Sequence, residues 1–265
     1  MTTTAEILNY IESIAPSFML EKWDNAGLLC GRSDKAVRKI LVALDPFLSV
    51  CEEAIAIDAD LIVTHHPLIF RDQVTAVNDN TQLGRCLLML IGHDICAINA
   101  HTNLDKAPGG VNDILAKTLG LDNIQIIAPE GCDSTGRPYG LLRYGNVDEQ
   151  PLCEFLSHVK KSLQAEGLRY IDCGKPVKCV AVGGGACADE MYAAAASGCD
   201  TFVTSDIKYN QFRTAFELGL NIIDAGHFHT ENPTMPVLAE KLQRQFPEIE
   251  VIFSENHRDP MKFFI

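Results

Sequence analysis

The sequence predicts an α/β fold with a largely parallel sheet, into which a second α/β domain is inserted. Two observations support this prediction. Short apolar runs rich in β-branched residues alternate with helical stretches along most of the 265 residues, and this alternation is typical of parallel sheets covered by helices. From about residue 127 to residue 174 prolines and glycines become frequent, which indicates that a second domain begins within the first.

Six apolar runs have the length and β-branched content of buried strands. In an open α/β sheet, the carboxyl ends of such strands form the edge where ligands bind. The predicted strands are Ile40–Leu44, Leu61–Thr64, Ile95–Ala100, Val177–Val182, Thr201–Thr204 and Asn221–Asp224.

Helical stretches lie between the predicted strands. Thr4–Ile14 has apolar residues spaced near 3.6, which predicts an amphipathic helix. Val111–Leu119 is followed by Gly120, a residue type suited to the position just after a helix. The alanine-rich stretch Asp189–Ser197 likewise ends at Gly198.

The remaining expected elements lie in the middle and near the end of the chain. A hairpin is expected around Leu141–Tyr144, followed by a helix over Leu152–Ala165. Asn232 and Pro233 have the character of an N-cap and a first helical residue, so they predict a helix that runs to about Phe246.

The composition is that of an ordinary globular protein and limits the classes of partner. Hydrophobic residues make up 47% and charged residues 22%, and the formal net charge is -13. Such an acidic chain is not expected to bind nucleic-acid backbones, although a bound metal would supply positive charge for a small anionic substrate. The ten cysteines include no CxxC pair, and no targeting or membrane-spanning segment stands out, so we expect a cytoplasmic protein with reduced thiols.

Five of the eight histidines fall in three short segments, each at or just after the end of a predicted strand. The first segment is THHP, residues 64–67. Pro67 ends strand pairing, so His65 and His66 can leave the sheet and face neighbouring metals, one each. The alternative is a strand end with two surface histidines.

The second segment, HTNLD at residues 101–105, precedes Pro108 and is expected to be a loop. His101 and Asp105 would offer an imidazole and a carboxylate there, and a carboxylate can bridge two divalent ions. The alternative role for Asp105 is a loop cap.

The third segment is HFHTE, residues 227–231. If it winds helically, His227 and Glu231 fall on one face, four residues apart, while His229 points elsewhere. The alternative is a solvated loop before a helix.

Taken together, the three segments predict a metal site. Mixed nitrogen and oxygen ligands suit zinc, iron, manganese, cobalt or nickel better than calcium. Five or six ligands exceed what one catalytic zinc requires, so we expect two divalent ions per chain.

The motifs WDNAGLL (23–29), THHPLIF (64–70), AHTNLD (100–105), TSDIKY (204–209) and DAGHFHTE (224–231) resemble those of the GTP cyclohydrolase 1 type 2 homologues, also called the NIF-three-like family. They occur in the family's order over nearly the whole chain, and the length matches the family's short members, which lack an extra inserted domain. The resemblance implies a two-domain fold with a discontinuous first domain, a homohexamer, and a dinuclear metal centre between the domains. It assigns the metal ligands to His65, His66, Asp105, His227 and Glu231.

On this basis we expect a first domain that carries the ligands and comprises residues 1–126 with about 206–265. The second domain would comprise about residues 127–205. His101 is placed near the metals by the resemblance.

Two metals at close range suit hydrolysis of a small phosphorylated or nucleotide substrate. His101 and His229 are candidates for proton transfer. The glycines at 183–185 are candidates for holding a phosphate through their amides, although a glycine triplet is more often only a tight turn. The alternative is a metal-binding scaffold without turnover, such as a metallochaperone or a regulatory ring that binds partners. The candidate substrate-binding residues are Asp24, Asn25, Ser205, Asp206 and Lys208. Structural roles are the alternative for the last three.

Overall fold

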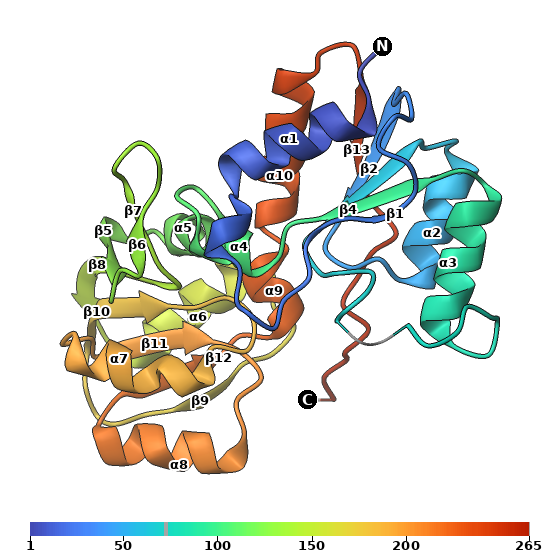
Figure 1. Ribbon diagram of the computed structural model, residues 1–265. Coiled ribbons are helices and arrows are strands. Elements are labelled where there is room, and N and C mark those ends of the chain that lie inside the picture. The colour runs from blue at the N-terminus through green and yellow to red at the C-terminus, as the bar shows by residue number, and fades with distance from the viewer. Residues whose placement is uncertain (72–73, 265) are drawn as a thin grey trace. The chain divides into compact units, whose positions relative to one another are not determined.

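The computed structural model describes residues 1–71 and 74–264 (Figure 1). The chain forms two compact units, each built around its own sheet. Unit 1 comprises Met1–Leu104 and Met235–Arg258, and unit 2 comprises Asp105–Thr234 and Asp259–Ile265. The prediction of an α/β fold with a discontinuous first domain and an inserted second one is therefore confirmed.

The sheet of unit 1 has five strands in the order β1-β4-β3-β2-β13. The central pairs are parallel, and only the edge strand β1 runs antiparallel to its neighbour β4. The strands are β1 (Gly27–Cys30), β2 (Lys39–Ala43), β3 (Leu61–Thr64), β4 (Cys96–Asn99) and β13 (Glu250–Phe253).

Helices cover both faces of this sheet (Figure 1). On one face, α2 (Leu48–Ala56) and α3 (Gln82–Gly92) bury their apolar residues against β2, β3 and β4. On the other lie α1 (Thr4–Ile14) and α10 (Thr234–Gln245), which meet where the rings of Tyr10 and Phe246 pack edge to face. A 3-10 turn, Ser17–Met19, follows α1.

The larger sheet of unit 2 has six strands in the order β5-β8-β10-β11-β12-β9. Its centre is parallel, from β10 through β11 to β12, and antiparallel strands complete both edges. The strands are β5 (Asp122–Ile127), β8 (Leu142–Gln150), β9 (Arg169–Ile171), β10 (Val177–Val182), β11 (Thr201–Thr204) and β12 (Asn221–Asp224).

Alternating residues of β11 show how this sheet is covered. Val203 packs with α5 (Val111–Thr118) and α6 (Leu152–Ser162), whereas Phe202 packs with α7 (Met191–Ala196) and α8 (Tyr209–Leu218). Because successive side chains of a strand point to opposite faces, the two helix pairs lie on opposite faces of the sheet. The short helices are α4 (Thr102–Lys106), α9 (His227–Glu231) and the 3-10 turn Ala188–Glu190.

Several details differ from the expectations. Residues 141–144 do not form a hairpin, because β8 begins at Leu142 and pairs with β5 and β10; the hairpin lies just before, between β6 (Gly131–Cys132) and β7 (Pro138–Tyr139). Asn232 is not an extended N-cap. It has helical dihedral angles and caps the end of α9.

The two units also differ in extent from the expected domain ranges, 1–126 with about 206–265 and about 127–205. All but the last residue of strand β5 lies before residue 127, yet β5 pairs with β8. Strand β12 lies after residue 206 yet pairs with β11. Strand pairing thus assigns both to the sheet of unit 2, and Asp105, His227 and Glu231 belong to that unit rather than to the first.

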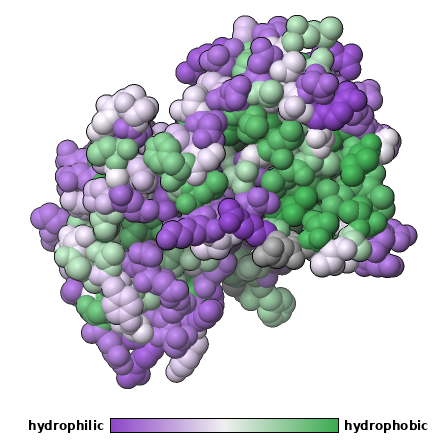
Figure 2. All heavy atoms as spheres, in the orientation of Figure 1, coloured by the Kyte–Doolittle hydropathy of each residue, from purple (hydrophilic) through white to green (hydrophobic). Residues whose placement is uncertain are grey.

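An apolar area lies on the surface of unit 1. Figure 2 shows hydrophobic side chains gathered on unit 1 over α2 and α3, where Leu88 and Ile91 are exposed. Among the described residues, no helix is long and apolar enough to span a bilayer.

Candidate metal centre

The parallel strands of unit 1 direct four segments to one edge of the sheet. His65 and His66 follow β3, His101 follows β4, Asp45 follows β2, and His257 follows β13. Because these four strands are parallel neighbours, their carboxyl ends share that edge, which is where α/β sheets bind ligands.

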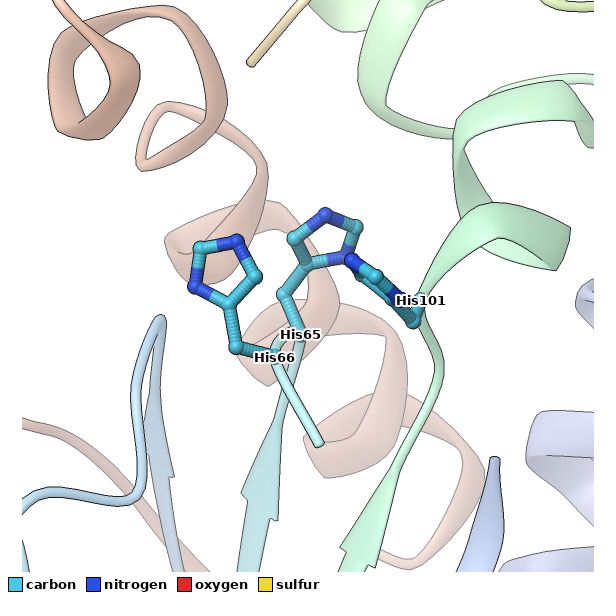
Figure 3. Close-up of side chains that lie close together, drawn as sticks. All are labelled: His65, His66 and His101. Carbon is cyan, nitrogen blue, oxygen red and sulfur yellow. The ribbon is translucent and has the colours of Figure 1, made fainter. Parts of the chain in front are cut away.

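The imidazoles of His65, His66 and His101 lie together at this edge (Figure 3). Their ring centroids are 5.1 to 5.5 Å apart. One nitrogen from each ring lies within 4.8 Å of the others, so the three can hold one metal ion. His65 is fully buried.

Each ring of this cluster is oriented by an acceptor at Nδ1. His65 Nδ1 lies 2.9 Å from the carbonyl oxygen of Ala100, His66 Nδ1 lies 2.6 Å from Asp45, and His101 Nδ1 lies 2.8 Å from Asp24. These acceptors favour a proton on Nδ1, so Nε2 is the nitrogen suited to bind a metal. Carboxylate–imidazole–metal arrangements of this kind are typical of metal centres.

The two orienting carboxylates of unit 1 are held in their ionised form. Asp24 is fully buried and accepts hydrogen bonds from His101, from the Thr102 amide and hydroxyl, and from the Asn25 amide. Burial alone would raise the pKa of Asp24, but the hydrogen bonds from His101 and Thr102 outweigh it and hold the pKa well below its usual range.

Asp45 behaves in the same way. Its burial opposes ionisation, yet hydrogen bonds from His257 and His66 hold the pKa of Asp45 well below the usual value. A negative charge is therefore fixed behind His66.

In unit 2 the parallel strands bring a second group of ligands together. His227 and Glu231 lie four residues apart on the short helix α9, and His227 Nε2 is 3.1 Å from Glu231 Oε2. The other ring nitrogen, Nδ1, lies 2.8 Å from Asp206, which follows β11. Carboxylates on both sides of the ring stabilise a positive charge there, either an imidazolium or a bound cation.

Asp105 lies in the same region as Glu231. Both carboxylates are buried. A carboxylate oxygen of Asp105 lies within 4.8 Å of one of Glu231. Burial raises the pKa of the Cys187 thiol, and the charges of Asp105 and Glu231 raise it further. The expected loop around Asp105 is instead the helix α4, in which Asp105 occupies the first turn.

Gly185 leaves space for this second group of ligands because it has no side chain. It has a positive φ of 64°, and a Cβ there would overlap Glu231 Oε1 and lie 3.1 Å from His227 Nε2. Any larger residue would therefore fill the space beside both ligands.

The glycines at 183–185 do not present their amides to a phosphate as expected. The Gly183 amide donates to the carbonyl of Val203. The Gly184 amide donates to Asn112, and the Gly185 amide to Thr230. All three amides have partners within the fold, which favours the alternative of a tight turn over a phosphate-binding loop.

The other candidate residues take varied positions. Asp24 is too buried to meet a substrate and instead holds His101, and Asn25 donates to the carbonyl of Ile69. Ser205 is buried and donates to the carbonyl of Gly185, while Lys208 is exposed before α8.

His229 lies apart from His227 on α9. Its Nδ1 is 3.2 Å from the carbonyl of Leu163, and its Nε2 is 3.3 Å from Asp259. These contacts tie His229 to the end of α6 and to the segment after Arg258.

Sequence reasoning missed Asp45 and His257, and it considered Gly185 for phosphate binding rather than for leaving space beside Glu231 and His227. Asp45 carried a usable signal, because it follows a predicted strand just as His65 and His101 do. His257 lies after a strand that was not predicted, and the packing around Gly185 depends on tertiary structure.

Comparison with known proteins agrees with the arrangement of the fold. The profile of the Duf34/NIF3 (NGG1p interacting factor 3) family matches residues 2–260. The chain belongs to this family. A relative from Clostridium perfringens, named GTP cyclohydrolase 1 type 2 homolog, is 38% identical over 97% of this chain and 98% of its own length.

Solved structures of the family share the fold. A Bacillus cereus protein related to NIF3 is 26% identical and superimposes with a TM-score of 0.93, covering 100% of this chain and 99% of its own. A hypothetical protein from Staphylococcus aureus is 32% identical with a TM-score of 0.92 and covers 99% of both chains.

This chain is a short member of the family. The Bacillus subtilis relative, 26% identical, aligns over 366 positions and 98% of its own length, against the 265 residues of this chain. The relative therefore carries additional residues, as expected for the longer members.

Proposed function

We propose that the chain binds two divalent metal ions and uses them to hydrolyse a small phosphorylated or nucleotide substrate. The ligands in unit 1 are His65 and His66, with His101 beside them, and the ligands in unit 2 are Asp105, His227 and Glu231. That the two groups form a single dinuclear centre is implied by the family resemblance and stays a prediction.

One observation carries the proposal of metal binding. Three imidazoles that gather at one strand edge are each oriented through Nδ1, two of them by carboxylates with lowered pKa. A protein core gains little from crowding three imidazoles, whereas a metal site needs both the crowding and the orientation. The donors are nitrogen and carboxylate oxygen, a set that suits zinc, manganese, iron, cobalt or nickel.

The protein's own residues would prepare the reaction. When bound, divalent ions lower the pKa of a coordinated water and stabilise developing negative charge on a substrate oxygen. Asp24 and Asp45 would keep His101 and His66 in the orientation that binds. If His101 is not a ligand, its Nε2 would be positioned to move a proton, because Asp24 fixes the other nitrogen.

The substrate class to test first is a purine nucleotide. The relatives from Clostridium perfringens and Clostridium acetobutylicum carry the name GTP cyclohydrolase 1 type 2 homolog, and hydrolytic ring opening is within the chemistry of a metal-activated water. A net charge of -13 makes bound cations the natural counter-charge for the phosphates of such a substrate.

Metal content per chain, measured by elemental analysis on protein purified without a metal-affinity tag, tests the first part. We expect about two ions in the wild type. His66→Ala should lower the metal content per chain by removing a ligand in unit 1. Asp105→Ala or His227→Ala should lower it by removing a ligand in unit 2. His158→Ala serves as the matched control, since among the described residues the His158 ring bonds the carbonyl of Leu119 and the Ser162 hydroxyl, outside both ligand groups. A wild type that stays metal-free after incubation with zinc or manganese would refute the proposal.

Turnover is tested on the metal-loaded protein with GTP and with a panel of phosphoesters. Formate release from GTP, or phosphate release from an ester, should depend on the metal and disappear in the ligand variants. A protein that holds two ions firmly but converts none of these substrates would favour the alternative of a metal-binding scaffold.

Self-association into a homohexamer is also part of the proposal, and it follows from the family resemblance alone. Light scattering after size exclusion should give about six times the 29.1 kDa of one chain. A monomer at micromolar concentration would contradict it.

A further inference from the structure

Behind His66 lies a chain of buried hydrogen bonds that the proposed metal centre does not itself require. Asp45 presents one carboxylate oxygen to each of two imidazoles. Its Oδ1 accepts from His66 Nδ1 at 2.6 Å, and its Oδ2 accepts from His257 Nε2 at 2.8 Å. All three residues follow parallel strands of the unit 1 sheet, β3, β2 and β13.

His257, at the far end of this series of hydrogen bonds, is itself held by neighbouring residues. The His257 amide donates to the Ser254 hydroxyl at 3.1 Å, and that hydroxyl donates to the carboxylate of Glu53 on α2. The ring of His257 packs edge to face on Phe47, with centroids 5.9 Å apart. His257 is 7% exposed, so little room exists for its ring to turn.

We propose that His257 is a positioning residue for the metal centre and acts on His66 through Asp45. A carboxylate that receives a single hydrogen bond can rotate about its Cβ–Cγ bond. The second bond, from His257, fixes that rotation and so fixes the oxygen that faces His66. The segment after β13 would thereby help set the direction of a metal-binding nitrogen located almost two hundred residues earlier in the sequence.

This inference rests on the proposed function, since it gives His257 a role in metal binding. Its test compares two variants of nearly equal size, His257→Gln and His257→Met. Glutamine keeps an N–H that can reach Asp45, and methionine fills the same space without a donor. Asp45→Asn interrupts the same chain from the other side, and His158→Gln is the control outside the network.

The first measurement is zinc affinity by competition with a chromophoric chelator. We expect about a tenfold loss for His257→Met and about 10- to 100-fold for Asp45→Asn, with His257→Gln and His158→Gln near wild type. The second measurement is the nitrogen chemical shifts of His66 in the metal-free protein. Wild type and His257→Gln should show the proton on Nδ1, and His257→Met should show a mixture of tautomers.

The two measurements separate the failure of this inference from failure of the proposed function. A wild type that binds no zinc would refute metal binding, while the His66 tautomer would still report whether His257 positions that ring. Zinc affinity and His66 shifts that are unchanged in His257→Met would overturn the inference. If His257→Met does not fold, His257→Leu, which also lacks a donor, takes its place: an unchanged His66 tautomer and an unchanged zinc affinity in that variant would overturn the inference.

Discussion

The two ligand groups of this protein are built on similar strand edges but are held by different means. In unit 1, each of three imidazoles is oriented by a hydrogen-bond acceptor at Nδ1, and one of these acceptors, Asp24, is fully buried. In unit 2, the carboxylate that orients His227 is Asp206, whose side chain is half exposed. There the restraint comes mainly from the turn of α9 and from the space left by Gly185.

This difference indicates two ways of preparing a metal ligand. Buried hydrogen bonds to a charged carboxylate are strong, and breaking one leaves an unsatisfied charge inside the protein. Steric fit around Gly185 needs no polar partner but tolerates no added atom. We therefore expect unit 1 to be sensitive to changes of hydrogen bonding and unit 2 to be sensitive to changes of volume.

The largest effect is expected for Gly185→Ala. The added Cβ would overlap Glu231 and strain a backbone with positive φ, which together cost roughly 3 kcal/mol, and metal affinity should fall at least tenfold. Gly198→Ala is the matched control, because Gly198 also has positive φ, 82°, but has nothing within 4 Å of the added atom. It should cost about 1 to 2 kcal/mol and keep the metal. Urea denaturation and metal titration of both variants measure this; equal metal affinities would contradict the steric account.

The next largest effect is the expected difference in stability and metal affinity between Asp24→Asn and Asp206→Asn. Asp24 accepts four hydrogen bonds in the core, so its replacement should cost about 2 kcal/mol of stability and 10- to 100-fold in metal affinity. Asp206→Asn removes a half-exposed contact, for which a stability change below about 0.5 kcal/mol and a smaller loss of affinity are expected. If both variants lose the same stability, burial is not what distinguishes the two units.

A smaller effect concerns which metal is bound. Imidazole ligands favour zinc, cobalt and nickel, and carboxylates favour manganese. His66→Ala should therefore weaken zinc binding more than manganese binding, and Glu231→Gln should weaken manganese binding more than zinc binding. Each variant should change the ratio of the two affinities by about tenfold. Competition titrations with the two metals give this ratio. A ratio that moves in the same direction in both variants would show that the two ligand groups have the same preference.

The smallest effect is on stability at acid pH, and it measures the contribution of the Asp45 charge to the free energy of unfolding. Its pKa in the folded protein lies below the unfolded value near 3.8, so its contribution is complete above about pH 4 and is lost as the pH falls through the folded pKa. In metal-free protein the wild type should lose stability more steeply than Asp45→Asn below pH 4, by at most about 1.4 kcal/mol per pH unit. Denaturation curves at pH 3 and pH 5 provide the comparison, and parallel losses would show that Asp45 does not contribute.

Much of the fold was predictable because its strands are buried on both faces. Leu61–Thr64, Val177–Val182 and Asn221–Asp224 are short, largely buried runs rich in Val and Ile, and the structure has them with those bounds. The edge strands were missed, since β9 is only three residues long and β5 is mostly exposed. Strand pairing, rather than composition, decides to which sheet such strands belong.

The histidines of the site were predictable, but the residues that orient them were largely not. His65, His66 and His101 follow strands whose apolar patterns are clear. Asp24 was noticed for its neighbours in sequence and given a substrate-binding role. Its actual partner, His101, lies 77 residues away, and no local pattern records such a pairing.

The parallel pairing of β13 with β2 has a consequence for the order in which the protein is made. On the ribosome, every strand of the unit 2 sheet has been synthesised by residue 224, while the unit 1 sheet still lacks Glu250–Phe253. Domains generally fold as units during synthesis, so the half of the protein that begins first is finished last. His257, which bonds Asp45, follows β13 in the chain, so the hydrogen bond that supports Asp45 and His66 can form only after the last strand of the unit 1 sheet has been made.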